Sequence, residues 1–230
     1  MAKFRMEQDV ERYVRGLAAI AEAKGPSGYY IWYGYSLIFP SCRYLAGRIQ
    51  ELSGADNQDE LRRWLEWMVE KGYRHSYDRL RHLLSPLPAE LRHDYIAAAI
   101  KGPEAEQARS ALVLRTMDEL PAAGIAAYDL GTAIYLCRAA MKLRWIGPAY
   151  GRDLQINCAN ALQEWYSGWD EYAAAYIAGA GFAAGAEGTA VMEAHQRRVL
   201  SLFGFSSGFA DNKIEWRTAL PAPKYREPGL

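Results

Sequence analysis

Residues 127–188 read AYDLGTAIYLCRAAMKLRWIGPAYGRDLQINCANALQEWYSGWDEYAAAYIAGAGFAAGAEG, and this stretch decides the fold class of the chain. Its apolar residues recur every three or four positions, the spacing of one helix face, in three successive segments. Gly147 and Pro148 separate the first two segments, because proline disfavours a helical residue before it and fits the first turn of a following helix. The third is expected to start at Ser167, with Asp170 as its capping-box partner. The stretch therefore predicts three consecutive helices.

The same spacing continues on both sides of this stretch. It predicts further helices over about residues 6–24, 41–52, 57–71, 77–84, 88–100, 103–119 and 189–203. Gly54 and Gly72 are expected to end the second and third of these helices. No strand pattern occurs, so the sequence predicts an all-α fold: a single compact domain over residues 1–230 with about nine or ten helices. Residues 1–53 would form N-terminal helices packed on the rest, and residues 204–230 an irregular tail.

Composition and charge restrict the class of protein. Half of the 230 residues are hydrophobic, which is sufficient for a sizeable core without disulfides or metals. The chain has 27 acidic and 27 basic residues, whereas binding to nucleic acid through phosphates needs a strongly basic surface. Nucleic acid is therefore not an expected partner. The three cysteines, Cys42, Cys137 and Cys158, are odd in number and widely separated, which fits a reducing cytoplasm.

No targeting or membrane-spanning segment is predicted. The first sixteen residues, MAKFRMEQDVERYVRG, mix charges of both signs and lack the apolar centre of a signal peptide. The longest uncharged runs, residues 28–42 and 173–186, have about fifteen residues, short of the roughly twenty that span a bilayer. We therefore expect a soluble cytoplasmic protein.

The run GYYIWYGYSLIFPSC, residues 28–42, is unusually rich in aromatic residues and has neither strand alternation nor a helical stripe. Two interpretations are open. The favoured one is a buried core segment, because aromatic side chains dominate core energetics. The other is an exposed binding patch that includes Trp32 and Tyr33, because tryptophan and tyrosine are enriched at interface hot spots.

Several patterns that imitate cofactor or catalytic sites fail on their spacing. His75, Asp78 and His82 would share a helix face, but the two histidines lie about 10 Å apart, too far for one metal ion about 2 Å from each. The glycines at 179, 181 and 185 follow a helix, whereas a dinucleotide fingerprint follows a strand. No nucleophile motif occurs. We predict no metal, no organic cofactor and no catalytic residue.

Two charged residues stand out in the first helix of the central stretch. Asp129 lies at its start, where a carboxylate can cap free amides. Arg138 interrupts an otherwise uncharged segment, so it either points outward or pairs with a buried carboxylate such as Asp129 or Asp170. The functional alternative is that Arg74, Asp129 and Arg138 converge on a polar pocket for an anionic or protein ligand.

Two stretches resemble a bacterial family catalogued as domain of unknown function 1266: residues 54–78, and residues 127–147 continued through 162–182. The resemblance covers about residues 54–203 and implies a helical fold. The positions that match the family's motifs are Gly72, Arg74, Asp129, Leu130, Gly131, Arg138, Trp169, Glu171 and Gly179. The chain departs from those motifs at Tyr73, Tyr128 and Ala180, where the family has histidine, tryptophan and arginine.

Two classes of function follow as hypotheses. The preferred one is a bacterial cytoplasmic protein that acts through protein–protein interaction without catalysis, with an immunity protein that neutralises a toxin or effector as its specific form. The alternative is an enzyme of unknown reaction with a polar pocket around Arg74, Asp129 and Arg138. A deep pocket with perturbed protonation would favour the enzyme, and a broad interaction surface would favour the binding protein.

Overall fold

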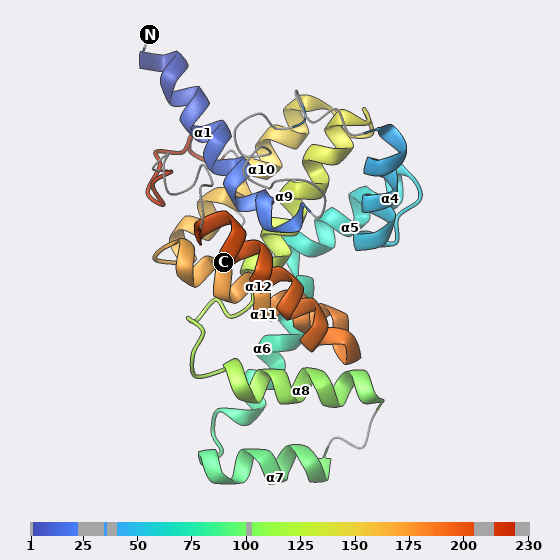
Figure 1. Cartoon of the computed structure of the whole chain (residues 1–230), viewed down its shortest axis with the longest axis vertical. Coiled ribbons are helices and arrows are strands. Elements are labelled where there is room, and N and C mark those ends of the chain that lie inside the picture. The colour runs from blue at the N-terminus through green and yellow to red at the C-terminus, as the bar shows by residue number, and fades with distance from the viewer. Residues whose placement is uncertain (1, 23–34, 36–40, 100–102, 205–213, 224–230) are drawn as a thin grey trace.

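The structure, a computed structural model, describes residues 2–22, 35, 41–99, 103–204 and 214–223 (Figure 1). These residues form helices and loops, with no strand among them. The helices are α1 (Ala2–Ala18), α4 (Cys42–Ser53), α5 (Gln58–Glu70), α6 (Gly72–Leu84), α7 (Ala89–Ala99), α8 (Glu104–Thr116), α9 (Ala126–Lys142), α10 (Pro148–Trp165), α11 (Trp169–Ala184) and α12 (Gly188–Gly204). Two short 3-10 segments, Ala19–Ala21 and Gly185–Glu187, extend α1 and join α11 to α12.

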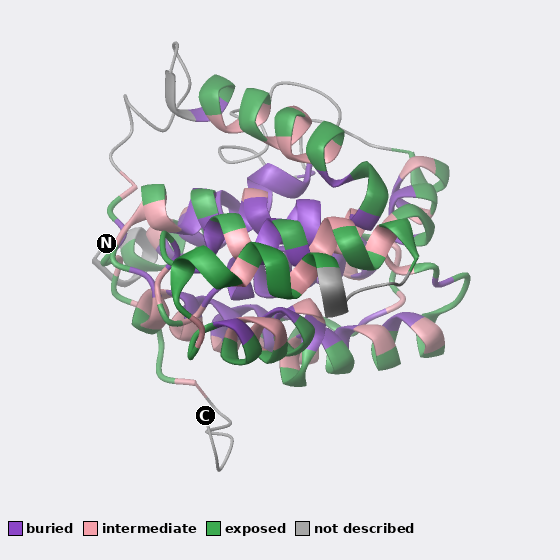
Figure 2. Ribbon diagram, turned by 90° about the horizontal axis from the view of Figure 1, so that it is seen from below, coloured by how far each residue is buried: buried purple, intermediate pink, exposed green. Residues whose placement is uncertain are grey.

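Helix α9 lies at the centre of the fold. It packs against α1, α4, α5, α6, α10 and α11, and every residue from Ala126 to Cys137 is buried. Figure 2 shows the buried residues gathered along the central helices. Helix α11 packs closely on α9 because Gly131 leaves room for two aromatic side chains: a Cβ there would lie 2.3 Å from the Tyr172 hydroxyl and 3.0 Å from the Tyr176 ring. Residues 127–188 thus supply a large part of the core.

The predicted all-helical class is confirmed, while the predicted division into helices is slightly off in its boundaries: the helix expected over residues 77–84 begins at Gly72. Asn57 caps α5 as expected, since its side chain accepts the N–H groups of Asp59 and Glu60. Gly72, expected only as a helix end, is also the first residue of α6, because its positive φ of 60° turns the chain directly into the next helix.

The predicted cap at Ser167 is wrong. Gly168 is the N-cap of α11, and it makes no side-chain capping bond. The reciprocal bond comes instead from Glu171, whose carboxylate accepts the Ser167 N–H at 2.8 Å. Asp170, the expected partner, does not make this bond because the helix begins one residue later than the sequence suggested.

Segments from both ends of the chain contact the central helices α9, α10 and α11. Helices α1 and α4, from the first 53 residues, both pack on α9. Residues 214–223, from the predicted irregular tail, lack helical structure. Trp32 and Tyr33 lie outside the described residues, whereas Tyr35 is described and buried. The single-domain boundaries stay a prediction.

In the part of the chain that the structure describes, no helix has the length and apolar character needed to cross a membrane.

Candidate functional site

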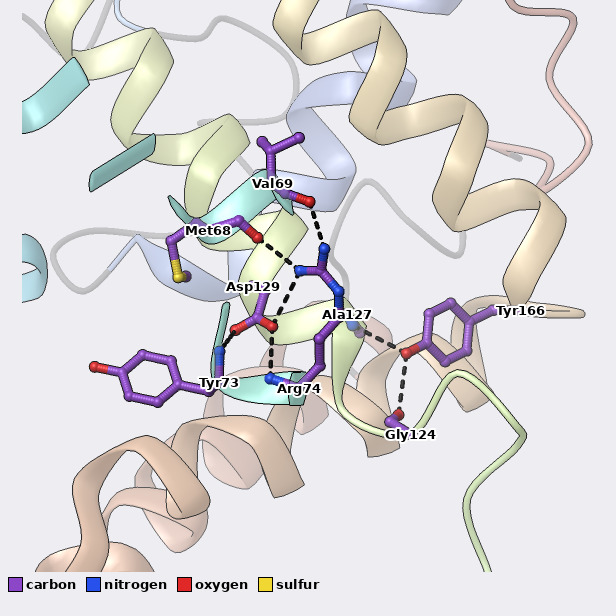
Figure 3. Close-up of polar contacts among 8 residues, drawn as sticks. All are labelled: Met68, Val69, Tyr73, Arg74, Gly124, Ala127, Asp129 and Tyr166. Atoms are coloured by element: carbon purple, nitrogen blue, oxygen red, sulfur yellow. Dashed lines mark hydrogen bonds and ion pairs between the residues drawn. The ribbon is translucent and has the colours of Figure 1, made fainter. Parts of the chain in front are cut away.

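The α5–α6 junction is joined to α9 by the carboxylate of Asp129 (Figure 3). Its Oδ1 accepts the N–H of Tyr73 at 3.1 Å, and its Oδ2 accepts the N–H of Arg74 at 2.9 Å. Both amides belong to the first turn of α6, where N–H groups have no partner within the helix. Asp129 therefore caps amides, as its type predicted, but they are the amides of α6, about 55 positions away in sequence, and not those of its own helix.

The Arg74 side chain completes this junction. Its Nη1 lies 3.4 Å from Asp129 Oδ2 and donates to the Met68 carbonyl at 2.6 Å, while its Nη2 donates to the Val69 carbonyl. These carbonyls belong to the last turn of α5, which also lacks partners within its helix. One arginine and one aspartate thus join the end of α5, the start of α6 and the start of α9.

Gly72 is required at this junction for steric reasons. Its φ of 60° is in the left-handed region that favours glycine. A Cβ built there would lie 2.2 Å from Asp129 Oδ2 and 3.0 Å from Arg74 Nη1. The three motif residues Gly72, Arg74 and Asp129 therefore form one unit.

The protonation of Asp129 is perturbed, which is a property that the enzyme hypothesis needs. Burial raises the pKa of Asp129 to about 7, although the hydrogen bonds and positive charge of Arg74 act in the opposite direction. However, Asp129 is 0% exposed, and both of its oxygens accept backbone amides. A substrate could not reach this carboxylate without opening the junction, so the geometry suits a structural role.

Tyr166 supports the same region and was not singled out in the sequence. Its hydroxyl accepts the Ala127 N–H at 3.0 Å and donates to the Gly124 carbonyl at 3.0 Å (Figure 3). Both groups lie around the start of α9. The phenol therefore fixes the turn that presents Asp129 to α6.

Arg138 does not join Arg74 and Asp129. It lies nine positions further along α9, about 13.5 Å at the rise of an α-helix. Its Nη1 donates to Gln155 Oε1 at 2.9 Å, and its Nη2 lies 2.6 Å from Glu11 Oε1. The expected partners, Asp129 and Asp170, are thus wrong. The reason is that this part of α9 faces α1 and α10, which supply Glu11 and Gln155.

Arg138 instead lines a groove between α1, α9 and α10 with a volume of about 740 Å³. Apolar side chains from all three helices, including Val10, Met141 and Ile156, form part of its wall. Its charged side chains are Glu7, Glu11, Arg15, Arg138, Lys142 and Arg152. Four of these are basic and two are acidic, so the groove carries an excess of two positive charges.

Most of this groove could not be predicted from the sequence. Glu11 and Gln155 reach Arg138 from helices 127 and 17 positions away in the chain, and only the packing of the helices brings them together. Tyr35, from the aromatic run, also lines the groove. The neighbouring candidates Trp32 and Tyr33 fall outside the described residues. Within the described part of the chain, no three histidine, cysteine or acidic residues are grouped closely enough to hold a metal ion.

The fold and the site define an all-helical protein in which one central helix carries a buried Asp–Arg junction and, two and a half turns later, an arginine at an open groove. The chain belongs to the family described as Protein of unknown function (DUF1266), whose model matches residues 53–210. The match includes Gly72, Arg74, Asp129 and Arg138 but not α1, which supplies Glu11. No curated protein and no solved structure matches the chain.

Proposed function

We propose that this chain is a non-catalytic bacterial cytoplasmic protein that acts by binding another protein, and that its partner is a toxin or effector which it neutralises as an immunity protein. The observation that carries the proposal is the groove around Arg138, formed by α1, α9 and α10. The Arg74–Asp129 junction gives little support to the enzyme alternative, because its polar atoms are used in contacts that hold the fold.

The groove suits an acidic protein segment. Its excess positive charge complements carboxylates, and its apolar wall can bury aliphatic or aromatic side chains of a partner. Arginine is enriched at interface hot spots, and its planar guanidinium matches carboxylate geometry. Gln155 and Glu11 hold the Arg138 guanidinium in place, which lowers the entropy lost when a partner binds.

The test uses charge reversal at the groove. Lys142 and Arg152 are exposed and line it, whereas Arg79 is exposed on α6 and does not. Three baits would be used in a lysate of the organism that encodes the chain: the full wild-type chain, the double variant Lys142→Glu/Arg152→Glu and the control Arg79→Glu. We expect an acidic protein to be retained by the first and third baits and reduced about tenfold or more on the second. Equal retention on all three baits would exclude the groove as the binding site.

The immunity role has a separate test. The captured protein would be expressed in a heterologous host with the wild-type chain or with the double variant. We expect the captured protein alone to stop growth, the wild-type chain to restore it, and the double variant to fail. A captured partner that is harmless to the host would exclude the immunity role and leave the binding role intact.

A further inference from the structure

Residues 214–223 are bound to α10 and α11 through their backbone. Gln163 Nε2 donates to the carbonyls of Trp216 at 2.7 Å and Thr218 at 2.9 Å. Asn160 Nδ2 donates to the Pro221 carbonyl at 3.0 Å, and Trp169 Nε1 donates to the Ile214 carbonyl at 2.9 Å. Every peptide has such carbonyls, so these donors recognise a backbone with little regard to its side chains.

One contact depends on a particular side chain, that of Trp216. It is 7% exposed, and its ring centroid lies 5.0 Å from that of Trp169 and 5.8 Å from those of Tyr13 and Tyr172. Its Nε1 donates to the Tyr166 carbonyl at 2.8 Å, at the C-terminal cap of α10. Tryptophan is enriched among the residues that anchor protein interfaces, and its N–H usually finds a partner when it is buried.

The segment and the three donors that hold it lie on opposite sides of the end of the family match. The donors Asn160, Gln163 and Trp169 lie within the family match, which ends at residue 210, and the bound segment lies beyond it. The segment has no helix of its own apart from a turn in which the Thr218 N–H donates to the Glu215 carbonyl at 3.2 Å. Figure 1 shows it in red beside α1. Its backbone is therefore held by side chains of α10 and α11, as that of a bound peptide would be.

We propose that this face of α10 and α11 is a peptide-binding site for an extended segment anchored by tryptophan, and that the chain's own residues 214–223 occupy it in place of such a segment from a partner protein. The partner carries the same pattern, a tryptophan followed by a basic residue, since Arg217 Nη1 also donates to the Gln163 carbonyl at 3.3 Å. The site is separate from the groove around Arg138, so neither proposal depends on the other.

The attached segment competes with any partner. A tethered ligand acts at an effective concentration in the millimolar range, so a free peptide at micromolar concentration binds the wild-type chain poorly. Removal of the anchor from the attached segment, by Trp216→Ala in the full chain, should open the site. The probe is a fluorescent peptide with the sequence of residues 211–223, DNKIEWRTALPAP.

We expect Trp216→Ala to bind this peptide at least about tenfold more tightly than the wild-type chain does. The same peptide with alanine in place of tryptophan should not bind. Adding Gln163→Ala to Trp216→Ala should weaken binding about tenfold, because two carbonyls lose their donor. Adding Gln196→Ala, at an exposed position on α12, should leave it unchanged. If a folded Trp216→Ala chain binds no peptide up to about 1 mM, the proposal fails.

A measurement on the wild-type chain covers the case in which the variant does not fold. We expect the indole N–H of Trp216 to exchange with solvent at least about tenfold faster than the slowest amides of α9, because release of the segment is a local opening. Equal rates would mean that the segment leaves only when the whole fold opens. That result would make residues 214–223 a part of the core and overturn the proposal.

Discussion

Asp129 and Arg138 lie nine positions apart on the same helix, and they stand in different environments. Asp129 is 0% exposed, and its oxygens accept two amides of α6. Arg138 has a side chain that is 13% exposed, but it lines a groove and pairs with Glu11, whose side chain is 50% exposed. Both are charged residues in a stretch of mostly apolar sequence. The difference shows that a charge within an apolar helix can either hold the fold together or line a binding surface.

The two sites differ in their access to water. Removal of one member of a buried pair leaves unsatisfied groups in a medium that cannot hydrate them, whereas water replaces a lost partner at an open site. The two ends of α9 should therefore respond differently to the same kind of change.

The largest effect is expected for Asp129→Ala. This change leaves two amides of α6 without an acceptor and the Arg74 guanidinium without its carboxylate, which should lower the free energy of unfolding by about 3–5 kcal/mol. Urea unfolding measures it. Arg138→Ala is the comparison on the same helix and should cost less, about 1–2 kcal/mol, because Glu11 stays hydrated and only the buried Gln155 Oε1 loses its donor. Similar costs for the two variants would show that the environments are not as different as we describe.

The next effect concerns the glycine beneath the carboxylate. Gly54 and Gly72 have similar positive φ values of 70° and 60°, but a Cβ at Gly54 meets nothing within 4 Å, whereas one at Gly72 lies 2.2 Å from Asp129 Oδ2. Gly54→Ala should therefore cost only the left-handed strain, about 1–2 kcal/mol. Gly72→Ala should cost about 1–3 kcal/mol more, because the carboxylate must move. Thermal or urea unfolding of both variants gives the difference, and equal costs would contradict the steric argument.

Much of the fold was predictable because it depends on local sequence. Helical spacing gave the all-helical class, and Asn57, Gly54 and the Gly147–Pro148 pair marked helix ends through the chemistry of single residues. The Ser167 cap failed because α11 begins one residue later, with Gly168 as its N-cap, so that Glu171 and not Asp170 accepts the Ser167 N–H.

The candidate site was less predictable because it depends on contacts between distant segments. The sequence could identify Asp129 as a capping residue but not the helix that it caps. It could show that Arg138 must either point outward or pair with a carboxylate, but Glu11 becomes available only when α1 packs on α9. The bound segment 214–223 carried no periodic signal at all, since its structure comes from the side chains of α10 and α11.

The pH dependence of stability gives a smaller and more specific test. Because the pKa of Asp129 is raised from 3.8 to about 7, the native protein holds a proton between these values that the unfolded chain releases. Stability should therefore fall as pH rises from about 4 to 7, with a slope below about 1.4 kcal/mol per pH unit. Asp129→Asn removes this contribution, and urea unfolding at several pH values measures the difference between the two proteins.

His195 makes the subtraction necessary. Burial, assisted by the charge of Arg198, lowers the pKa of His195 to about 4, so the unfolded chain binds the extra proton and stability should rise with pH over the same range. Both proteins carry His195, and its contribution cancels in the comparison. A difference between wild-type and Asp129→Asn that does not change between pH 4 and 7 would show that Asp129 is ionised throughout.

The smallest effect is expected at the open end of α9, for the pair between Arg138 and Glu11. Their atoms lie as close as 2.6 Å, closer than the 3.4 Å between Arg74 and Asp129, so distance alone would rank this pair as the stronger. Solvent reverses that ranking, because the Glu11 carboxylate is half exposed and remains hydrated without Arg138.

A double-mutant cycle with Arg138→Ala and Glu11→Ala should give a coupling free energy of about 0.2–1 kcal/mol at low salt. It should decrease further in 1 M NaCl, where the Debye length is about 3 Å. A coupling above about 2 kcal/mol that salt does not change would place Arg138 in the same class as Asp129, as a residue that holds the fold, and would remove the main support for a binding groove at this end of the helix.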